Sequence, residues 1–394
     1  MERAELAGWL RLTLSPGIGN ETARRLLAAF GLPENIFQQP LTALTQVANT
    51  AQAAGLASAP PELEALLTAT WDWLHAPIGD QGDVCKRIIT LGDTDYPASL
   101  LAINDPPLVL YVQGDASIVC AKPANAGRLG RSFAHSVAIV GSRNPTPQGT
   151  MNARRFARTL AQAGLTIVSG LALGIDGAAH EGALEGAEAD LDRLATIAVV
   201  GTGLDRVYPK THLDLARRIT ARGVIVSEYP IGTPPLSTNF PKRNRIIAAL
   251  SQGTLVVEAA LKSGSLITAR EASEQGKEVF AIPGSIHSTQ TRGCHALIKQ
   301  GAKLVESAQD VLEELRWDDG AGPATNHGAD IACGPAPEDT PVLRALGFDP
   351  VGLDALQART GIDTARLQAQ LMALELQGEV ARLPGGLFQR IAHS

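Results

Sequence analysis

The sequence predicts an α/β protein whose central part is a mainly parallel, doubly wound sheet. Apolar strands alternate with helical segments from about residue 84 to residue 305, and this order is typical of parallel sheets with helices on both faces. Several strands are continuous β-branched runs, as expected where both faces are covered. Glycine-rich turns follow many strands. Because parallel strands end at one edge of a sheet, these turns predict a ligand site along that edge.

Residues 1–75 are predicted to form an N-terminal helical domain. Pro16-Gly17-Ile18-Gly19 separates two segments with helical apolar periodicity, an arrangement similar to a helix-hairpin-helix (SAM-like) domain. Such a turn can direct backbone N–H groups at a phosphate, and Arg24 and Arg25 follow on the second helix. A plain helical turn in a small packing domain is the alternative.

Residues 76–316 are predicted to form the sheet domain. The expected strands are 87–91, 108–112, 136–141, 165–170, 195–201, 223–228, 253–259, 277–284 and 302–306. The expected helices are Gln148–Ala163, Gly174–Glu185, His212–Arg222, Arg243–Leu250, Leu266–Gln275 and Cys294–Gln300. An acidic insertion at 186–193 interrupts the pattern and is expected to be a surface loop.

The last 78 residues divide into a linker and a small domain. Residues 317–340 are rich in Asp, Gly, Ala and Pro, which is typical of a linker. Residues 341–394 show three helical segments and two strands around Pro384-Gly385-Gly386, similar to a winged helix. From residue 340 onward the sequence contains five Arg and five acidic residues, so the charges of these side chains cancel. A duplex-gripping winged helix usually has a basic face, so protein contact is favoured here over DNA contact.

Composition places the chain among cytoplasmic globular proteins. The charge is −6, and 45% of the residues are hydrophobic. The four cysteines (Cys85, Cys120, Cys294 and Cys333) form no CxxC, which argues against a disulfide framework or a zinc site. The amino terminus does not resemble a signal peptide, and no apolar run reaches the length of a membrane span.

A cationic segment stands out in this acidic chain. Between Pro235 and Arg270 there are five basic residues and one acidic residue, a local charge of +4, and an anionic ligand is the simplest reason for it. Within FPKRNR (240–245), Phe240 offers a ring for stacking a base, while Lys242 and Arg243 can neutralise phosphates and Asn244 can hydrogen-bond a base edge. Aromatic rings beside cations favour single strands, whose bases are free to splay.

Some residues of this cationic segment also permit a structural interpretation. The FPKRNR motif could be a proline-bounded loop with solvated cations and Phe240 packed in the core. Arg245 could be packed beneath that loop rather than face a ligand.

Two further loops are expected to join this site. The strand at 136–141 ends in Gly141-Ser142-Arg143, where glycine frees backbone N–H groups, serine donates a hydrogen bond and arginine can fork onto a phosphate. Lys262-Ser263-Gly264 precedes a helix and could complete the same pocket. An ordinary turn with a solvated Arg143 is the alternative.

The sequence offers weaker evidence for catalysis than for ligand binding. Asp176 and His180 share a helical face, but a local role, with Asp176 capping and orienting His180, is favoured over metal binding. GTGLDR (201–206) lacks the third glycine of a dinucleotide fingerprint, and Walker A and GxSxG motifs are missing. Glu228 and Glu258 end strands and could form a catalytic pair, or equally could pair with arginines or cap loops. We therefore expect no enzymatic turnover, no metal and no cofactor.

Seven motifs in order resemble one family. They are VAIVGSRNPT, SGLALGIDGAAH, IAVVGTGLDRVYP, SEYP, FPKRNRII, VVEAALKSGSLITA and VFAIPG, and the resemblance that contains them spans about Val137 to Gly301. Together they resemble the DNA-processing protein DprA (Smf) family, and both flanks are similar to its helical and winged-helix modules. Leu173 departs from the arginine common at that position, without removing a residue assigned to the pocket.

The resemblance implies a function and a site. It implies an extended Rossmann-like fold and a homodimer that binds single-stranded DNA, protects incoming strands during natural transformation, and loads RecA past single-strand-binding protein. Carried over by motif, the DNA-binding residues are Gly141, Ser142, Arg143, Phe240, Lys242, Arg243, Asn244, Lys262, Ser263 and Gly264.

Two other functions remain open at this stage. One is a Rossmann-like nucleotide-processing hydrolase, although its usual PGGxGT motif is missing from the central sheet. The other is a scaffold that acts chiefly through its terminal modules.

Overall fold

The computed structural model describes residues 1–76, 84–120, 128–187, 193–317, 340–348, 350–383 and 385–391. Most of the predicted linker (318–339) and most of the predicted insertion (188–192) lie outside the described residues. Within the described part, no helix is both long enough and apolar enough to cross a bilayer.

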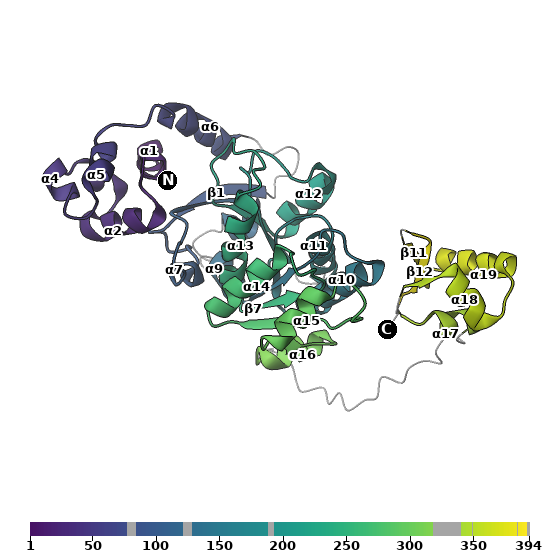
Figure 1. Ribbon diagram of the computed structural model, residues 1–394. Helices are drawn as coiled ribbons and strands as arrows, with labels where there is room; N and C mark the ends of the chain where they lie inside the picture. The colour runs from purple at the N-terminus through teal and green to yellow at the C-terminus, as the bar shows by residue number, and fades with distance from the viewer. Residues whose placement is uncertain are drawn as a thin grey trace, which may run out of the picture.

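A nine-stranded sheet forms the centre of the molecule (Figure 1). Its strand order is β1-β2-β6-β5-β4-β3-β7-β8-β9. The strands are β1 (Val84–Thr90), β2 (Val109–Asp115), β3 (Ser136–Val140), β4 (Thr166–Ser169), β5 (Thr196–Val199), β6 (Val224–Ser227), β7 (Gly253–Val256), β8 (Glu278–Ala281) and β9 (Lys303–Leu304). Strands β3 to β9 run parallel, while β1 and β2 add an antiparallel edge next to β6. The predicted mainly parallel sheet is confirmed.

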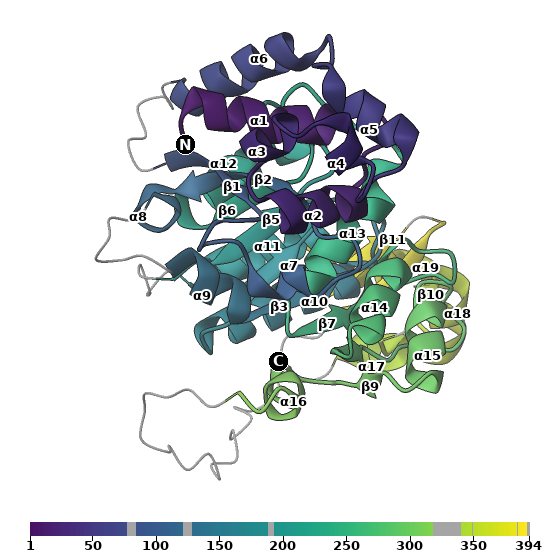
Figure 2. The ribbon, with the colours of Figure 1, turned by 90° about the vertical axis from the view of Figure 1, so that its left-hand side faces the viewer.

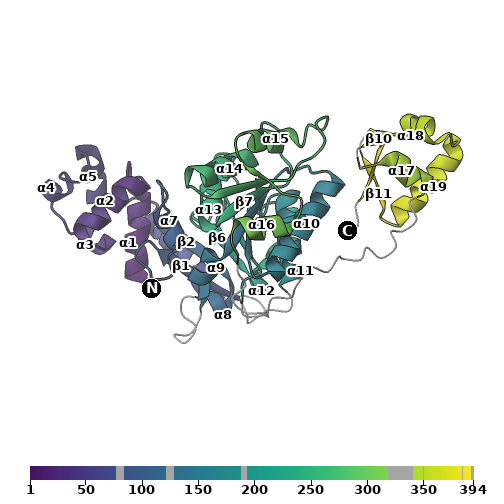
Figure 3. The same cartoon turned by 90° about the horizontal axis from the view of Figure 1, so that it is seen from below.

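Helices cover both faces of this sheet, as a doubly wound fold requires (Figures 1 and 3). Side chains alternate along β3: Val137 and Ile139 pack with α10, α11 and α16, while Ala138 and Val140 pack with α13 and α14 on the other face. The helices of the sheet region are α7 (Ala98–Leu101), α8 (Ala116–Val119), α9 (Arg128–Ala134), α10 (Pro147–Gln162), α11 (Ile175–Gly186), α12 (Leu213–Arg222), α13 (Asn239–Leu250), α14 (Ser265–Glu274), α15 (Arg292–Lys299) and α16 (Ala308–Glu314).

The chain reverses its winding direction next to β3. From β3 it winds outward through β4, β5 and β6, and it then crosses by α13 to β7 on the other side of β3. In open α/β sheets the crevice at such a switch point, outside the carboxyl ends of the strands, is the usual ligand site.

Residues 1–76 contain six helices, which precede the sheet: α1 (Arg3–Leu14), α2 (Asn20–Phe30), α3 (Pro33–Phe37), α4 (Leu41–Leu44), α5 (Thr50–Ala57) and α6 (Leu63–His75). The predicted hairpin joins α1 to α2, and Gly17 adopts a φ of 73° there, which favours glycine. Figures 1 and 2 place these helices beside the edge of the sheet that contains β1 and β2. Ile88, Val109 and Tyr111 from those strands share one apolar core with them.

Residues 340–391 form a unit with its own apolar core. It contains α17 (Pro341–Leu346), β10 (Val351–Gly352), α18 (Leu353–Thr360), α19 (Thr364–Leu376), β11 (Val380–Leu383) and β12 (Leu387–Arg390). Figure 3 labels all of these except β12, which is labelled in Figure 1. β11 and β12 form the wing, whose turn has Gly385 and Gly386 at positive φ. A short β10, which the sequence pattern did not indicate, pairs with β12.

The cysteine prediction was wrong for one pair. Cys85 on β1 and Cys120 at the end of α8 form a disulfide, with their Cα atoms 6.2 Å apart. The two residues are 35 positions apart in the chain, so a search for short CxxC spacings misses a pair that packing of α8 against β1 brings together. Cys294 is free and buried, and Cys333 lies outside the described residues.

Candidate nucleic-acid interface

A cavity of about 660 Å³ opens at the switch point of the sheet, and we call it the rim pocket. Its walls come from the loops after β3, β4, β5 and β7, from the start of α13 and from the start of α14. Nine of the ten predicted site residues line it: Gly141, Ser142, Arg143, Phe240, Arg243, Asn244, Lys262, Ser263 and Gly264. Residues up to 123 positions apart in the chain therefore meet in one place.

Close packing shapes the loop after β3. A Cβ on Gly141 would lie 2.7 Å from Cγ1 of Ile175, so glycine lets the loop pass against α11. The Ser142 N–H donates to the carbonyl of Glu258 at 2.7 Å, and its buried hydroxyl accepts from the Asn144 N–H at 3.1 Å. Arg143 is left exposed at the tip of the loop, where its guanidinium is available to a ligand.

The segment Phe240–Asn244 is helical throughout, although the sequence predicted a helix only from Arg243 onward. Helix α13 begins at Asn239, so Pro241 falls in the first turn, where a missing N–H costs no hydrogen bond. Helical geometry turns Phe240 and Lys242 to different sides of α13. Phe240 lines the rim pocket, whereas Lys242 is exposed and is absent from its walls.

Arg243 forms part of the pocket floor and is almost completely buried. Its side chain is only 4% exposed, and Nη1 donates to the carbonyl of Val199 at the end of β5. Gly170 provides the room, because any Cβ there would collide with the guanidinium. Burial lowers the pKa of Arg243 to about 10, opposed by the nearby Asp176 carboxylate. Arg243 thus stays charged at neutral pH and attracts an anion from the floor.

Asp176 and His180 have separate partners. Asp176 accepts from the N–H groups of Gly170 at 3.1 Å and Ala172 at 3.4 Å, so it caps the loop after β4, as the local interpretation requires. Burial nevertheless raises its pKa, opposed by Arg243 and these hydrogen bonds. His180 instead pairs with the hydroxyl of Thr196 at 2.7 Å. The expectation that Asp176 orients His180 was wrong.

Both strand-end carboxylates are engaged elsewhere. Glu258 accepts from the backbone N–H of Thr146 at 2.9 Å and from its hydroxyl, which holds the start of α10. Glu228 forms a two-point ion pair with Arg245, at 2.6 Å and 2.7 Å. They therefore do not form a carboxylate pair. Among the described residues, no group of three His, Cys, Asp or Glu could hold a metal ion.

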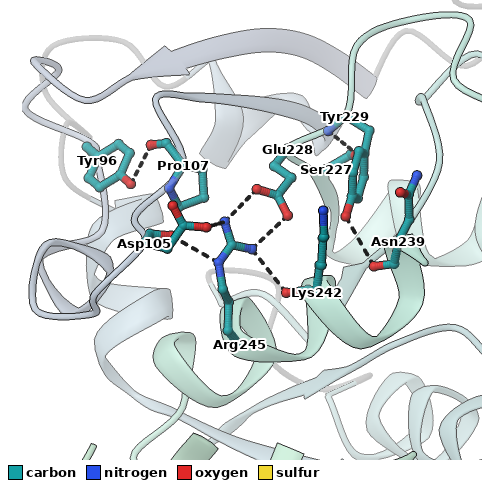
Figure 4. A network of polar contacts seen from close by, with 9 residues as sticks. All are labelled: Tyr96, Asp105, Pro107, Ser227, Glu228, Tyr229, Asn239, Lys242 and Arg245. Carbon is teal, nitrogen blue, oxygen red and sulfur yellow. Dashed lines mark hydrogen bonds and ion pairs between the residues drawn. The ribbon is translucent and has the colours of Figure 1, made fainter. Parts of the chain in front are cut away.

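Arg245 connects α13 to its surroundings (Figure 4). Besides Glu228, its guanidinium reaches the Asp105 carboxylate at 3.3 Å and the Asp105 carbonyl at 3.0 Å. It also donates to the Lys242 carbonyl at 3.1 Å, within the first turns of the helix. The Tyr229 hydroxyl donates to the Asn239 carbonyl at 3.1 Å. The structural interpretation of Arg245 is the one that the geometry supports.

Tyr208 is a pocket residue to which the sequence analysis assigned no role. It follows β5, and its ring centroid lies 5.6 Å from that of Phe240 with an interplanar angle of 31°. The Arg143 guanidinium lies 5.5 Å from the Phe240 centroid, within cation–π range. Phe240 is half-buried, whereas Tyr208 is 46% exposed. Tyr208 is thus the ring more accessible to a base, and its place in the VYP motif was the available signal.

Helix termini add to the electrostatic attraction. Helices α11, α13 and α14 all begin beside the rim pocket, where their dipoles favour negative charge. Asn244 connects the first turns of α13 to the start of α14, because its Nδ2 donates to the Gly264 carbonyl at 3.2 Å. Exposed Lys262 extends the cationic rim formed by Arg143. The effective cations are therefore fewer than the local charge of +4 suggests, since Arg245 is neutralised and Arg243 is buried.

A doubly wound, mainly parallel sheet with a ligand crevice at its switch point defines a Rossmann-like protein, and the cations and rings of this pocket could hold an anionic, aromatic ligand. A family model described as "DNA recombination-mediator protein A" matches residues 87–316, and one described as "DprA winged helix domain" matches residues 329–386. The chain belongs to the DNA recombination-mediator protein A family.

Known relatives cover most of its length. Protein Smf of Escherichia coli (strain K12) is 42% identical over 322 residues, covering 80% of this chain and 78% of that protein. Protein Smf of Synechocystis is 33% identical over 435 residues, covering 99% and 100%. The X-ray structure of DNA processing protein A (DprA) from Streptococcus pneumoniae superposes with a TM-score of 0.61 at 34% identity, covering 80% of this chain and 98% of that one.

Proposed function

We propose that this protein is a recombination mediator that binds single-stranded DNA in the rim pocket without cleaving it. The observation that carries the proposal is the convergence of Arg143, Lys262, Phe240 and Tyr208 on one cavity above the buried Arg243. Cations neutralise the phosphates, and exposed rings stack unpaired bases. In a duplex the bases are already stacked on each other, so the rings would contribute little.

The finer parts of the proposal follow family membership. The protein acts as a homodimer in the cytoplasm, protects incoming strands during natural transformation, and loads RecA onto strands covered by single-strand-binding protein. Membership of a family described as recombination mediators supports this role. The engagement of Glu228 by Arg245 and of Glu258 by Thr146 supports binding without turnover.

Binding is tested by fluorescence anisotropy with labelled dT oligomers and with a duplex of equal length, over a series of salt concentrations. We expect tighter binding to the single strand and an affinity that falls steeply as salt rises. Equal affinity for the duplex, or an affinity independent of salt, contradicts the proposal. Strand exchange by RecA on strands covered with single-strand-binding protein then tests the loading step.

The alternative hydrolase is tested by a sugar-release assay with AMP. We expect no turnover above the background rate. Turnover that disappears in Glu258→Gln, while that variant remains folded, would replace the proposed function with nucleotide hydrolysis.

A further inference from the structure

A second, smaller cavity adjoins the rim pocket, and we call it the side pocket. It has a volume of about 190 Å³ and lies between α12, the residue that follows β5, and side chains of β2 and β6. Its walls are mainly aliphatic, from Leu171, Val200, Leu204, Val207, Leu213 and Ile225. Apolar walls of this kind favour a flat, weakly polar group over a bare phosphate.

Tyr208 joins the two cavities, since it lines both of them. Together with Leu213 it is one of two large apolar side chains at the side pocket that are close to half exposed, at 46% and 45%. A chain that lies in the rim pocket and passes over the Tyr208 ring would therefore reach the side pocket next.

The side pocket has about the size of a single ring. An apolar protein cavity of about 150 Å³ accommodates benzene, so 190 Å³ suits a pyrimidine base and is tight for a purine. Gln113 and Thr220 are the uncharged polar side chains in its walls. An amide offers both a donor and an acceptor, as the edge of thymine requires. Thr220 already donates to the Arg217 carbonyl at 2.9 Å, which leaves its oxygen free to accept.

Two arginines also line the side pocket. They are Arg206, from the loop after β5, and the exposed Arg217, from α12. Arg206 is paired with its neighbour Asp205 at 2.6 Å, so Arg217 is the stronger candidate for a phosphate. A base in the cavity and a phosphate at its edge together match one nucleotide of a longer strand.

We propose that the side pocket receives one unstacked pyrimidine base of the strand held in the rim pocket, with Tyr208 as the shared wall and Arg217 beside the adjoining phosphate. This inference rests on the proposed function and adds a base-binding subsite to it. It also gives binding a local preference for thymine or cytosine at one position.

An abasic scan tests the subsite in the full-length protein. A single abasic site is moved along a short dT oligomer, and the affinity is measured at fixed salt. We expect a loss of about tenfold at the position held in the side pocket, as at positions stacked on Phe240 or Tyr208, because a stacked base contributes about 1–3 kcal/mol. Adenine should weaken binding similarly at the side-pocket position alone, since that cavity is tight for a purine, whereas stacking on a ring accepts either kind of base.

Two variants on α12 assign that position to the side pocket. Ala216 lines the cavity and is 3% exposed, so Ala216→Leu fills it, whereas Ala221→Leu, on the same helix but outside the lining, is the matched control. In Ala216→Leu the affinity should no longer depend on which base, if any, stands at that position. In Ala221→Leu this dependence should remain. Melting curves show whether each variant is folded.

A second pair does not depend on filling a buried space. Arg217→Ala should weaken binding about threefold to tenfold and reduce its salt dependence, because one phosphate contact is lost. Arg218→Ala, one residue along the same helix and outside the lining, should not.

The outcomes separate the two proposals. If the wild type binds single strands and Arg143→Ala weakens binding, but adenine is tolerated at every position or Arg217→Ala and Arg218→Ala behave alike, the side pocket inference is overturned and the proposed function remains. If the wild type does not bind single strands, both fail.

Discussion

The rim pocket and the C-terminal winged-helix unit both contain several cations, but they arrange them differently. In the rim pocket Arg143, Arg243 and Lys262 line one cavity that also contains two aromatic rings. From residue 340 onward, five Arg are matched by five acidic residues. Helix α19, which corresponds to a recognition helix, has Arg366 as its one basic residue and exposes Met372 (64%) and Leu376 (81%). The two regions therefore differ in the arrangement of their charges and not merely in the number of cations.

The two regions also differ in what supports their charges. Beneath the rim pocket, Arg243, Asp176 and His180 are buried and tied to strand ends or loops. The described residues of the winged-helix unit bury no charged side chain. Substitutions below the rim pocket should therefore affect stability and binding together, whereas surface substitutions in the winged-helix unit should affect neither strongly.

The largest effect is expected for the cation on the pocket floor. Arg243→Met removes a buried charge and leaves the buried Asp176 without its compensation, which typically costs about 3–5 kcal/mol. Arg366→Met, on exposed α19, should change the free energy of unfolding by less than about 0.5 kcal/mol. Urea unfolding of both variants measures the contrast, and equal midpoints would mean that Arg243 is not a buried structural cation.

The next effect is a loss of stability in acid. Burial, with help from His212 and Arg243, lowers the pKa of His180 from 6.5 to about 3. Below pH 6.5 the unfolded chain therefore takes up a proton that the folded chain does not. The contribution of neutral His180 is complete above pH 6.5 and declines as the pH falls toward 3, by about 1.4 kcal/mol per pH unit.

Replacing His180 checks this directly. His180→Gln should lose the corresponding part of the acid dependence, measured as unfolding free energy between pH 6.5 and 5. Residues 340–391 contain no histidine, so the winged-helix unit should not share this effect. An unchanged pH slope in His180→Gln would refute the assignment.

A smaller effect, on binding rather than folding, should distinguish two exposed arginines. Arg143→Ala removes a charge-assisted contact with phosphate, and we expect single-strand affinity to fall about tenfold or more, because such hydrogen bonds contribute about 1.5–3 kcal/mol. Arg366→Ala is the matched change in the winged-helix unit and should leave the affinity unchanged. Anisotropy titrations at one salt concentration compare them, and similar losses would move the site away from the rim pocket.

The smallest effect concerns the support of α13. Arg245→Lys keeps the charge but loses the fork that reaches both Glu228 and Asp105, and we expect a loss of about 1 kcal/mol in stability and a weaker single-strand affinity. Arg87→Lys, at the Arg87–Asp95 ion pair outside the pocket, is the control. If both variants bind DNA like the wild type, Arg245 does not position the site.

The sequence identified the sheet and most of the pocket because both depend on local signals. Apolar runs, several of them β-branched, marked the nine strands, and glycines such as Gly141 marked turns at their ends. The features that the sequence did not predict depend on tertiary packing. No local pattern distinguishes buried Arg243 from exposed Lys242, and Pro241 suggested a loop although a first helical turn accepts proline. The disulfide likewise depends on the packing of α8 against β1.

Photo-crosslinking with 5-iodouracil tests the central claim most directly, because this base reacts with aromatic rings that it contacts. We would substitute one thymine at a time in a dT oligomer, irradiate the complex with the full-length protein, and identify crosslinked peptides by mass spectrometry. The account predicts crosslinks at Tyr208 or Phe240, weakened in Arg143→Ala and unchanged in Arg366→Ala. Crosslinks confined to the winged-helix unit, at Phe348 or Phe388, would contradict it.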